Sequence, residues 1–153
     1  MDIGFGGGFP IVPLAFVLPN IQFIGIESKK KKCLAVEQII KHFSLTNIQL
    51  LHGRFEEFLF DREVTITSKA VTTIENLLKG LNYSVTTHVF FYKGPNLFAL
   101  EEKGLNNIHN EWEIMTNNSI KVPNTEGRTL VGFKNKIVPR GTAKKLAKIS
   151  GFL

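Results

Sequence analysis

Apolar and polar positions along the chain follow two different periods. Short runs rich in β-branched and aromatic residues predict strands, whereas apolar residues three and four positions apart predict helices. The predicted strands are, in chain order, Ile21–Ile26, Ile48–Leu51, Val64–Thr67, Val89–Tyr92, Trp112–Met115 and Arg128–Phe133. The predicted helices are Lys29–Phe43, Thr72–Leu81 and a segment within Asn96–Lys103, with one helical turn over Arg54–Phe58.

The order of these elements predicts an α/β fold. Strands that alternate with helices form βαβ units and therefore a mostly parallel, doubly wound sheet. The strands are nearly continuous apolar runs, which is typical of a sheet covered on both faces. No clear helix separates Trp112–Met115 from Arg128–Phe133, so we expect these strands to form an antiparallel C-terminal hairpin. Asn106–Asn110 and Asn117–Asn124 are expected as loops.

The length of 153 residues suits one domain. We expect residues 1–133 to form it and residues 134–153 to form a basic C-terminal tail. The apolar stretch Phe9–Leu18 is too short for a membrane span, which needs about 20 residues. No basic region precedes this stretch, so it does not resemble a signal peptide either. With Cys33 as the single cysteine, an intramolecular disulfide is excluded, and we expect a cytoplasmic protein.

The positive charge is concentrated at one end of the chain. The net charge is +6, and residues 127–153 contain seven Lys or Arg and no Asp or Glu. Residues 1–126 contain 12 basic and 13 acidic residues, so the last 27 residues carry the whole excess. A localised basic segment is typical of a protein that binds a polyanion such as nucleic acid. A solvated chain end has the same composition and is the alternative.

The chain begins with the glycine-dense segment MDIGFGGGFP. Glycine suits a strand-to-helix turn because it adopts positive φ and lets backbone N–H groups approach a ligand closely. The dinucleotide-binding spacing G-x-G-x-x-G would need glycine at Phe9, and no Lys-Ser or Lys-Thr follows as in a P-loop. The segment therefore fits neither the dinucleotide-binding motif nor the P-loop. A nicotinamide-dependent oxidoreductase and a plain tight turn stay as alternatives.

The segment instead fits D-x-G-x-G-x-G, in which Asp2 precedes Gly4, Gly6 and Gly8. This pattern resembles motif I of Rossmann-like methyltransferases that use S-adenosylmethionine. Glu27 stands 19 residues after Gly8, at the end of the first predicted strand after the turn. An acid at about that distance bonds ribose hydroxyls in folds of this kind. The alternative is that Glu27 takes no part in binding.

Longer segments extend the resemblance to one family. DIGFGGGFPIVPLA (2–15) is similar to the D-I-G-S-G-x-G-F-P-G-I-P-L signature of ribosomal RNA small subunit methyltransferase G, the glucose-inhibited division protein B family. Further segments match that family in order and spacing: ESKKKKCL (27–34), LTNIQLLHGRFEEF (45–58), ITSKAV (66–71), FFYKGPN (90–96) and VPRGTAKK (138–145). The match is close over roughly the first two thirds of the chain and looser beyond.

The resemblance implies a bacterial, cytoplasmic, monomeric enzyme. It would transfer a methyl group from S-adenosylmethionine to N7 of a guanine in 16S ribosomal RNA or the small ribosomal subunit. The implied cofactor-binding residues are Asp2, Gly4, Phe5, Gly6, Gly8, Phe9, Glu27, Ser28, Phe55, Glu56 and Ser68. Among these, Glu27 would bind the ribose, and Phe55 and Glu56 would flank the adenine. The implied RNA-facing residues are Lys31, Lys69, Lys93, Arg140, Lys144 and Lys145, with Ser68 beside them.

Methylation at guanine N7 needs few catalytic groups. N7 carries a free lone pair, so no proton is removed before the attack, and catalysis can rest on alignment. We therefore expect no catalytic residue and no metal. Cys33 lies on the apolar stripe of a predicted helix, and the four histidines lack metal-ligand spacing. Enzymes that methylate exocyclic amines usually carry an Asn-Pro-Pro-Tyr-like motif after the fourth strand. This chain has Ser68-Lys69-Ala70 at that place, which argues against methylation of an amine.

Other residues leave two interpretations open. Lys29–Lys32 either surrounds an RNA cleft, because phosphate contacts supply much of RNA affinity, or forms a solvated first helical turn. Arg54 either contacts RNA or braces Glu56 or Glu57. Trp112 is expected in the core rather than in a base-stacking platform.

Three features depart from the family pattern. Phe5 stands where the family has Ser or Thr, and Lys69 stands where it has Arg. The family also has a helical region and a full first strand before the glycine motif. Here only Met1–Ile3 precede it, so we expect a truncated first strand. A non-catalytic RNA-binding remnant of the family is the alternative function.

Overall fold

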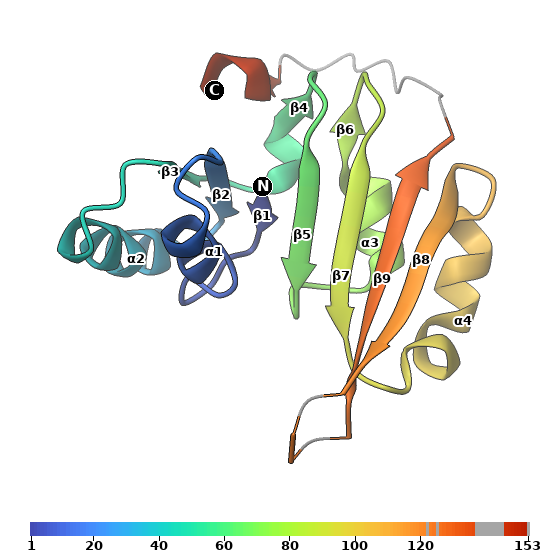
Figure 1. The fold of residues 1–153 in the computed structure, drawn as a ribbon. Coiled ribbons are helices and arrows are strands. Elements are labelled where there is room, and N and C mark those ends of the chain that lie inside the picture. The colour runs from blue at the N-terminus through green and yellow to red at the C-terminus, as the bar shows by residue number, and fades with distance from the viewer. Residues whose placement is uncertain (122, 125, 137–145, 153) are drawn as a thin grey trace.

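A computed structural model describes residues 1–121, 123–124, 126–136 and 146–152. Its centre is a seven-stranded sheet in the order β3-β2-β1-β5-β7-β9-β8 (Figure 1). These strands are β1 (Asp2–Ile3), β2 (Phe23–Glu27), β3 (Ile48–His52), β5 (Thr65–Lys69), β7 (His88–Lys93), β8 (Trp112–Ile120) and β9 (Arg128–Asn135). A smaller sheet in the order β10-β4-β6 comprises β4 (Phe58–Phe60), β6 (Asn82–Tyr83) and β10 (Ala147–Lys148).

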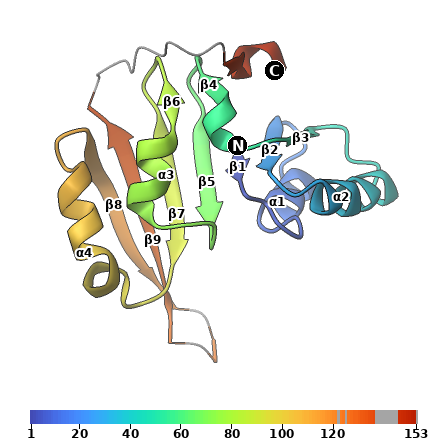
Figure 2. The same cartoon turned by 180° about the vertical axis from the view of Figure 1, so that it is seen from behind.

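Helices pack on both sides of the large sheet. They are α1 (Ile11–Val17), α2 (Lys30–His42), α3 (Ile74–Gly80) and α4 (Leu97–Ile108), with short 3-10 turns η1 (Phe55–Glu57) and η2 (Ile149–Phe152). Helices α1 and α2 lie beside β2 and β3, whereas α3 and α4 lie against the other part of the sheet (Figure 2).

The strand directions confirm the predicted fold class. Strands β1, β2, β3, β5 and β7 run parallel, and β9 runs antiparallel between β7 and β8. The fold is therefore Rossmann-like α/β, a doubly wound sheet with an antiparallel C-terminal hairpin. From β1 the chain builds outward to β3 and then returns to β5 on the other side of β1. In such sheets, ligands bind outside the carboxyl ends of the strands at this reversal.

Two hydrophobic clusters hold the helices to the sheet. The larger cluster joins strand residues to α3 and α4 and includes Leu77 and Trp112. The smaller cluster lies under α1 and α2 and includes Phe5, Cys33 and Val36. Trp112 and Cys33 are 2% and 3% exposed, which confirms the prediction that both belong to the core.

The strands differ in how far they are covered. Four consecutive residues of β2, from Ile24 to Glu27, are buried, as expected for a strand packed on both faces. In β5 and β7, buried residues alternate with more exposed ones. The reason is that α3 and α4 cover one face there, and no described helix covers the other (Figures 1 and 2). The prediction of two covered faces is therefore wrong for these strands.

Two predicted loops are partly regular structure. Helix α4 continues to Ile108, and β8 continues to Ile120. The polar segment Asn117–Ile120 forms a strand because its backbone pairs with β9, for example Asn117 with Val131. Such pairing satisfies backbone groups regardless of the low strand propensity of asparagine.

The last described residues pack against the middle of the chain. Strand β10 pairs in parallel with β4, and Ile149 is fully buried in the larger cluster. Ser150 donates two hydrogen bonds to Asp61, from its backbone N to Oδ1 at 2.9 Å and from its Oγ to Oδ2 at 2.7 Å. Residues 147–152 are thus held by the folded unit. Within the described residues, no helix has both the length and the hydropathy needed to span a membrane.

Candidate functional site

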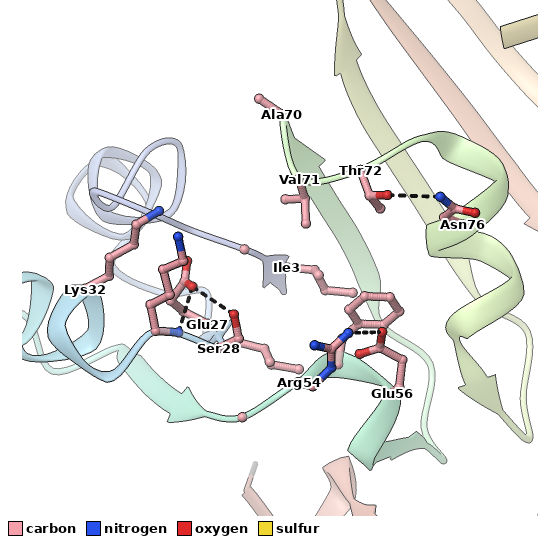
Figure 3. Close-up of a pocket in the computed structure, with 15 residues that line it drawn as sticks. Ile3, Glu27, Ser28, Lys32, Arg54, Glu56, Ala70, Val71, Thr72 and Asn76 are labelled. Atoms are coloured by element: carbon pink, nitrogen blue, oxygen red, sulfur yellow. Dashed lines mark hydrogen bonds and ion pairs between the residues drawn. The ribbon is translucent and has the colours of Figure 1, made fainter.

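A cleft of about 530 Å³ lies at the carboxyl ends of β1, β2, β3 and β5. This is the edge where the fold places ligands, and the volume lies in the range of small-molecule sites. The cleft is lined by Ile3, Gly4, Ile26, Glu27, Ser28, Lys29, Lys32, Gly53, Arg54, Phe55, Glu56, Ala70, Val71, Thr72 and Asn76. In Figure 3, Glu27, Ser28 and Lys32 lie on one side of the cleft, and Val71, Thr72 and Asn76 lie on the opposite side.

The glycine turn brings backbone close to the cleft. Gly4, Gly6 and Gly8 have φ of 70°, 57° and 92°, in the left-handed region that favours glycine. A Cβ on Gly4 would stand 2.4 Å from Val71 Cγ2, so the turn after β1 touches the loop after β5. Gly8 faces inward, where a Cβ would stand 3.0 Å from Val12 Cγ2. Glycine at these positions therefore serves both the backbone conformation and close packing.

Glu27 ties two turns together. Its Oε2 accepts a hydrogen bond from Gly6 N at 3.1 Å, and its Oε1 accepts from Lys29 N at 2.9 Å and from Ser28 Oγ at 3.4 Å. The residue is 6% exposed and lines the cleft. A carboxylate offers about four acceptor sites. Glu27 therefore keeps capacity for a further donor while it fixes the turns after β1 and β2.

Turn η1 closes the lower part of the cleft in Figure 3. Arg54 Nη2 donates to Glu56 Oε1 at 3.2 Å, and Arg54 N donates to Glu57 Oε2 at 2.9 Å. The Arg54 side chain thus braces Glu56, and at 69% exposed it is also accessible to RNA, so both interpretations stay. Glu56 Oε2 is buried and has no hydrogen-bond partner in the described structure.

Five predicted cofactor-binding residues line the cleft: Gly4, Glu27, Ser28, Phe55 and Glu56. Gly6 adjoins it through its bond to Glu27. Phe5 and Phe9 lie elsewhere. Phe5 is 1% exposed in the smaller core cluster, and its Cδ1 lies 2.6 Å from the position of a Cβ on Gly25. Phe9 is 63% exposed and is not a lining residue of the cleft.

Asp2 faces away from the cleft. Successive residues of a strand point to opposite faces, so Ile3 faces the cleft and Asp2 lines a second cavity of about 450 Å³. Its Oδ1 accepts from Thr67 Oγ1 at 2.9 Å, and its Oδ2 is buried without a partner in the described structure. Burial raises the pKa of Asp2 to about 6, against smaller opposing effects of Thr67 and nearby positive charges. Ser68 is 3% exposed and stands opposite Ile3 in the β1–β5 ladder.

The predicted RNA-facing residues separate into three groups. Lys31 and Lys69 are exposed. Lys93 is engaged within the protein: its Nζ donates to Glu101 Oε1 at 2.7 Å and to Thr72 O at 3.0 Å. Its side chain is only 14% exposed, so it does not present its charge to a polyanion. The remaining three, Arg140, Lys144 and Lys145, lie outside the described residues.

Some cleft residues were not predicted from the sequence as ligand-binding residues. Thr72 and Asn76 follow β5, and their signal in the sequence is only their place after a predicted strand. Lys29 and Lys32 belong to the basic run Lys29–Lys32, and the structure places both on the cleft. Among the described residues, no group of three or more His, Cys, Asp and Glu is arranged to hold a metal ion.

The sequence matches one family. The family described as rRNA small subunit methyltransferase G matches residues 1–131. The protein of that description from Marinobacter nauticus is 30% identical over 128 residues, which cover 83% of this chain and 59% of that protein. The one from Francisella tularensis subsp. tularensis is 34% identical over 143 residues, 90% of this chain and 65% of that protein. The chain thus spans about three fifths of the length of these relatives.

Solved structures resemble the fold. TYW2 from M. jannaschii, in complex with AdoMet, has a TM-score of 0.62 at 16% identity and covers 90% of this chain and 68% of its own. TrmK from M. capricolum, in complex with S-adenosyl-homocysteine, has a TM-score of 0.62 at 13% identity and covers 94% of this chain and 64% of its own. At such low identities the likeness concerns the fold alone.

Proposed function

Because the chain belongs to the family of rRNA small subunit methyltransferase G, we propose that its cleft binds S-adenosylmethionine and that it methylates N7 of a guanine in small-subunit ribosomal RNA. One observation carries the cofactor assignment. The buried carboxylate of Glu27, at the end of β2, bonds Gly6 of the glycine turn and lines the cleft. An acid so placed suits the ribose hydroxyls of a nucleoside cofactor.

The other lining residues fit the remaining parts of this cofactor. Gly4 exposes backbone at the cleft, where a short turn allows close approach. Glu56 lines the cleft with a carboxylate that suits the amino group of the adenine, and Phe55 offers an apolar flank beside it. Ser28 adds a hydroxyl next to Glu27. We therefore assign Gly4, Glu27, Ser28, Phe55 and Glu56 to the cofactor site, with Gly6 holding Glu27.

The proposed reaction asks the protein to bind and align. Bound S-adenosylmethionine supplies a methyl group on a positively charged sulfur. Guanine N7 presents its lone pair without losing a proton, so the chain needs no general base, and alignment of the two reactants lowers the barrier. Thr72 and Asn76 place a hydroxyl and an amide on the wall opposite Glu27. We assign them to the side of the cleft that receives the base.

Exposed cations around the cleft suit an RNA partner. Lys31 and Lys69 are free to meet phosphates, and phosphate contacts supply much of the affinity in such complexes. We propose 16S ribosomal RNA, alone or in the small subunit, as the partner of a monomeric protein. Arg140, Lys144 and Lys145 are assigned to the same partner from the sequence.

Titration calorimetry with S-adenosylhomocysteine tests the cofactor assignment. We expect the folded chain to bind it and Glu27→Ala to bind about 10- to 100-fold more weakly, because charge-assisted hydrogen bonds are lost. Glu113→Ala, on the exposed part of β8, is the control and should bind like the wild type. Equal affinity of all three proteins would remove Glu27 from the site.

Methyl transfer to RNA transcripts tests the reaction. A small-subunit ribosomal RNA transcript should accept the methyl group, and one made with 7-deazaguanosine should not, because it lacks N7. Transfer to the 7-deaza transcript would contradict N7 as the target. RNA binding by a folded chain that binds no S-adenosylhomocysteine would instead support a non-catalytic RNA-binding protein.

A further inference from the structure

Lys93 and Glu101 form a shielded ion pair behind the cleft. Lys93 is the last residue of β7 and Glu101 lies in α4, and their Nζ and Oε1 atoms are 2.7 Å apart. Both side chains are 14% exposed, and Lys93 Nζ also stands 5.7 Å from the centroid of the Phe91 ring. An ion pair with so little solvent contact holds a defined geometry, unlike exposed pairs, which contribute little.

Both members of the pair also bind the loop between β5 and α3. Lys93 Nζ donates to Thr72 O at 3.0 Å. Glu101 Oε2 accepts from Ile74 N at 2.6 Å. Ile74 is the first residue of α3, so its N–H has no intrahelical acceptor. The pair therefore fixes the backbone on both sides of Thr73.

The loop held in this way forms one wall of the cleft. Its first residue, Ala70, has φ of 57°, which is costly for a residue other than glycine and needs support from its surroundings. Val71 packs against Gly4, where its Cγ2 stands 2.4 Å from the position of an added Cβ. Thr72 Oγ1 accepts a hydrogen bond from Asn76 Nδ2 at 3.4 Å, as drawn in Figure 3. Displacement of this loop would open the wall opposite Glu27.

We propose that Lys93 and Glu101 are positioning residues of the cleft, which hold the loop of residues 70–73 against the glycine turn. The pair acts as a unit, because each member neutralises the other and each supplies one bond to the loop. The expected effect on cofactor binding rests on the proposed function, whereas the effect on the position of the loop does not. In this arrangement the ammonium group of Lys93 bonds Glu101 and Thr72 within the protein.

Hydrogen exchange of the unliganded protein tests the positioning directly. We expect Lys93→Met and Glu101→Gln each to speed exchange at the buried amide of Ile74, which donates to Glu101, by about tenfold or more, because the loop opens more often. The double variant Lys93→Met/Glu101→Gln, which leaves no buried unpaired charge, should match the single variants rather than add to them. Lys103→Met and Glu102→Gln, on the exposed side of α4, are the matched controls.

Two exchange results would overturn the proposal. One is unchanged exchange at the Ile74 amide in the double variant. The other is an increase spread evenly over the protein, including β9, because that pattern reports a loss of global stability without a specific effect on the loop.

Ligand affinity gives a second, separable result. S-adenosylhomocysteine should bind the single and double variants about tenfold more weakly than the two control variants, and Lys93→Arg should recover part of the loss. Wild-type affinity in the double variant would contradict the role in the cleft. If the wild type itself binds no S-adenosylhomocysteine, the proposed function fails while the exchange result still decides the positioning role.

The salt dependence of RNA binding separates positioning from phosphate contact. Loss of one phosphate contact lowers the slope of log affinity against log salt by about one. We expect Lys93→Met to keep the wild-type slope toward a small-subunit ribosomal RNA fragment, and Lys69→Met to lower it. A lower slope for Lys93→Met would show that Lys93 contacts phosphate and would overturn the proposal.

Discussion

At the scale of single residues, two buried carboxylates of neighbouring strands have different surroundings. Glu27 receives hydrogen bonds from Gly6, Ser28 and Lys29. Asp2 receives one from Thr67 Oγ1 and keeps a buried oxygen without a partner in the described structure. Burial without full hydrogen bonding disfavours the charged form, which is why the pKa of Asp2 is raised to about 6. Asp2 therefore opposes folding when it ionises.

This raised pKa predicts how Asp2→Asn changes stability with pH. The native pKa lies above the ordinary value of 3.8 for an unfolded aspartate, so the wild type loses stability as pH rises from about 4 to about 6. The variant lacks this loss and keeps an acceptor for Thr67. Relative to the wild type, it should gain up to about 3 kcal/mol between pH 4 and pH 8. Urea unfolding at both pH values measures the difference.

Asp61→Asn is the matched control and should show the opposite sign. Desolvation acts to raise the pKa of Asp61, but the hydrogen bonds from Ser150 and nearby groups outweigh it and lower the pKa, so the contribution of Asp61 to stability is present above about pH 4 and is lost as pH falls. If Asp2→Asn gained nothing over the wild type between pH 4 and pH 8, the native Asp2 would not have a raised pKa.

At the scale of elements, the turn between β1 and α1 depends on glycine at some positions and not at others. Gly4 combines a φ of 70° with a close approach to Val71. At Gly7, by contrast, a Cβ would meet no heavy atom within 4 Å, and Gly7 is not among the residues of positive φ. Gly4 and Gly7 thus differ both in backbone conformation and in the space available to a Cβ.

Gly4→Ala should therefore destabilise the protein and weaken S-adenosylhomocysteine binding. We expect the free energy of unfolding to fall by about 2–4 kcal/mol, from left-handed strain and overpacking against Val71. Gly7→Ala should change it by less than about 0.5 kcal/mol. Adding Val71→Ala to Gly4→Ala should recover the overpacking part only. Thermal and urea unfolding of the four proteins would refute this if Gly4→Ala and Gly7→Ala were equally stable.

At the scale of the whole molecule, the smaller sheet joins segments that are distant in the sequence. Strand β10 pairs with β4 at the registers Ala147–Phe58 and Lys148–Leu59, and β4 also pairs with β6. Phe152 packs edge-on against Phe58, with ring centroids 6.2 Å apart. The end of the described chain thus stabilises the segment that leads from the cleft into β5.

Ile149→Ala tests this long-range contact. Ile149 is 0% exposed, and removing a buried aliphatic side chain of this size costs about 2–5 kcal/mol. We expect a loss of unfolding free energy in that range, in a single cooperative transition. Leu100→Ala, at a position 81% exposed, should change stability little. An equally small effect at Ile149 would show that residues 147–152 are not part of the cooperative unit.

The sequence alone was sufficient for features encoded by neighbouring residues. The order of the main strands of the large sheet and of α2, α3 and α4, the glycine turn and the place of Glu27 at the end of β2 follow from periodicity and spacing, because backbone geometry sets the periods of two and of 3.6 residues. These local features also carry the family resemblance. The parallel sheet and the position of the cleft follow from them through general rules of α/β folds.

Only the tertiary structure decided features that join distant segments. From the sequence, the family resemblance implies that Lys93 faces RNA. Its pairing with Glu101, and the contact of this pair with the loop before α3, form only when β7, α3 and α4 pack together. The pairing that extends β8 through asparagines and the burial of Ile149 have the same origin. Local propensity and spacing do not determine which remote group a side chain meets. That is decided by how the elements pack, since contacts across the sheet and its helices set burial and hydrogen bonding.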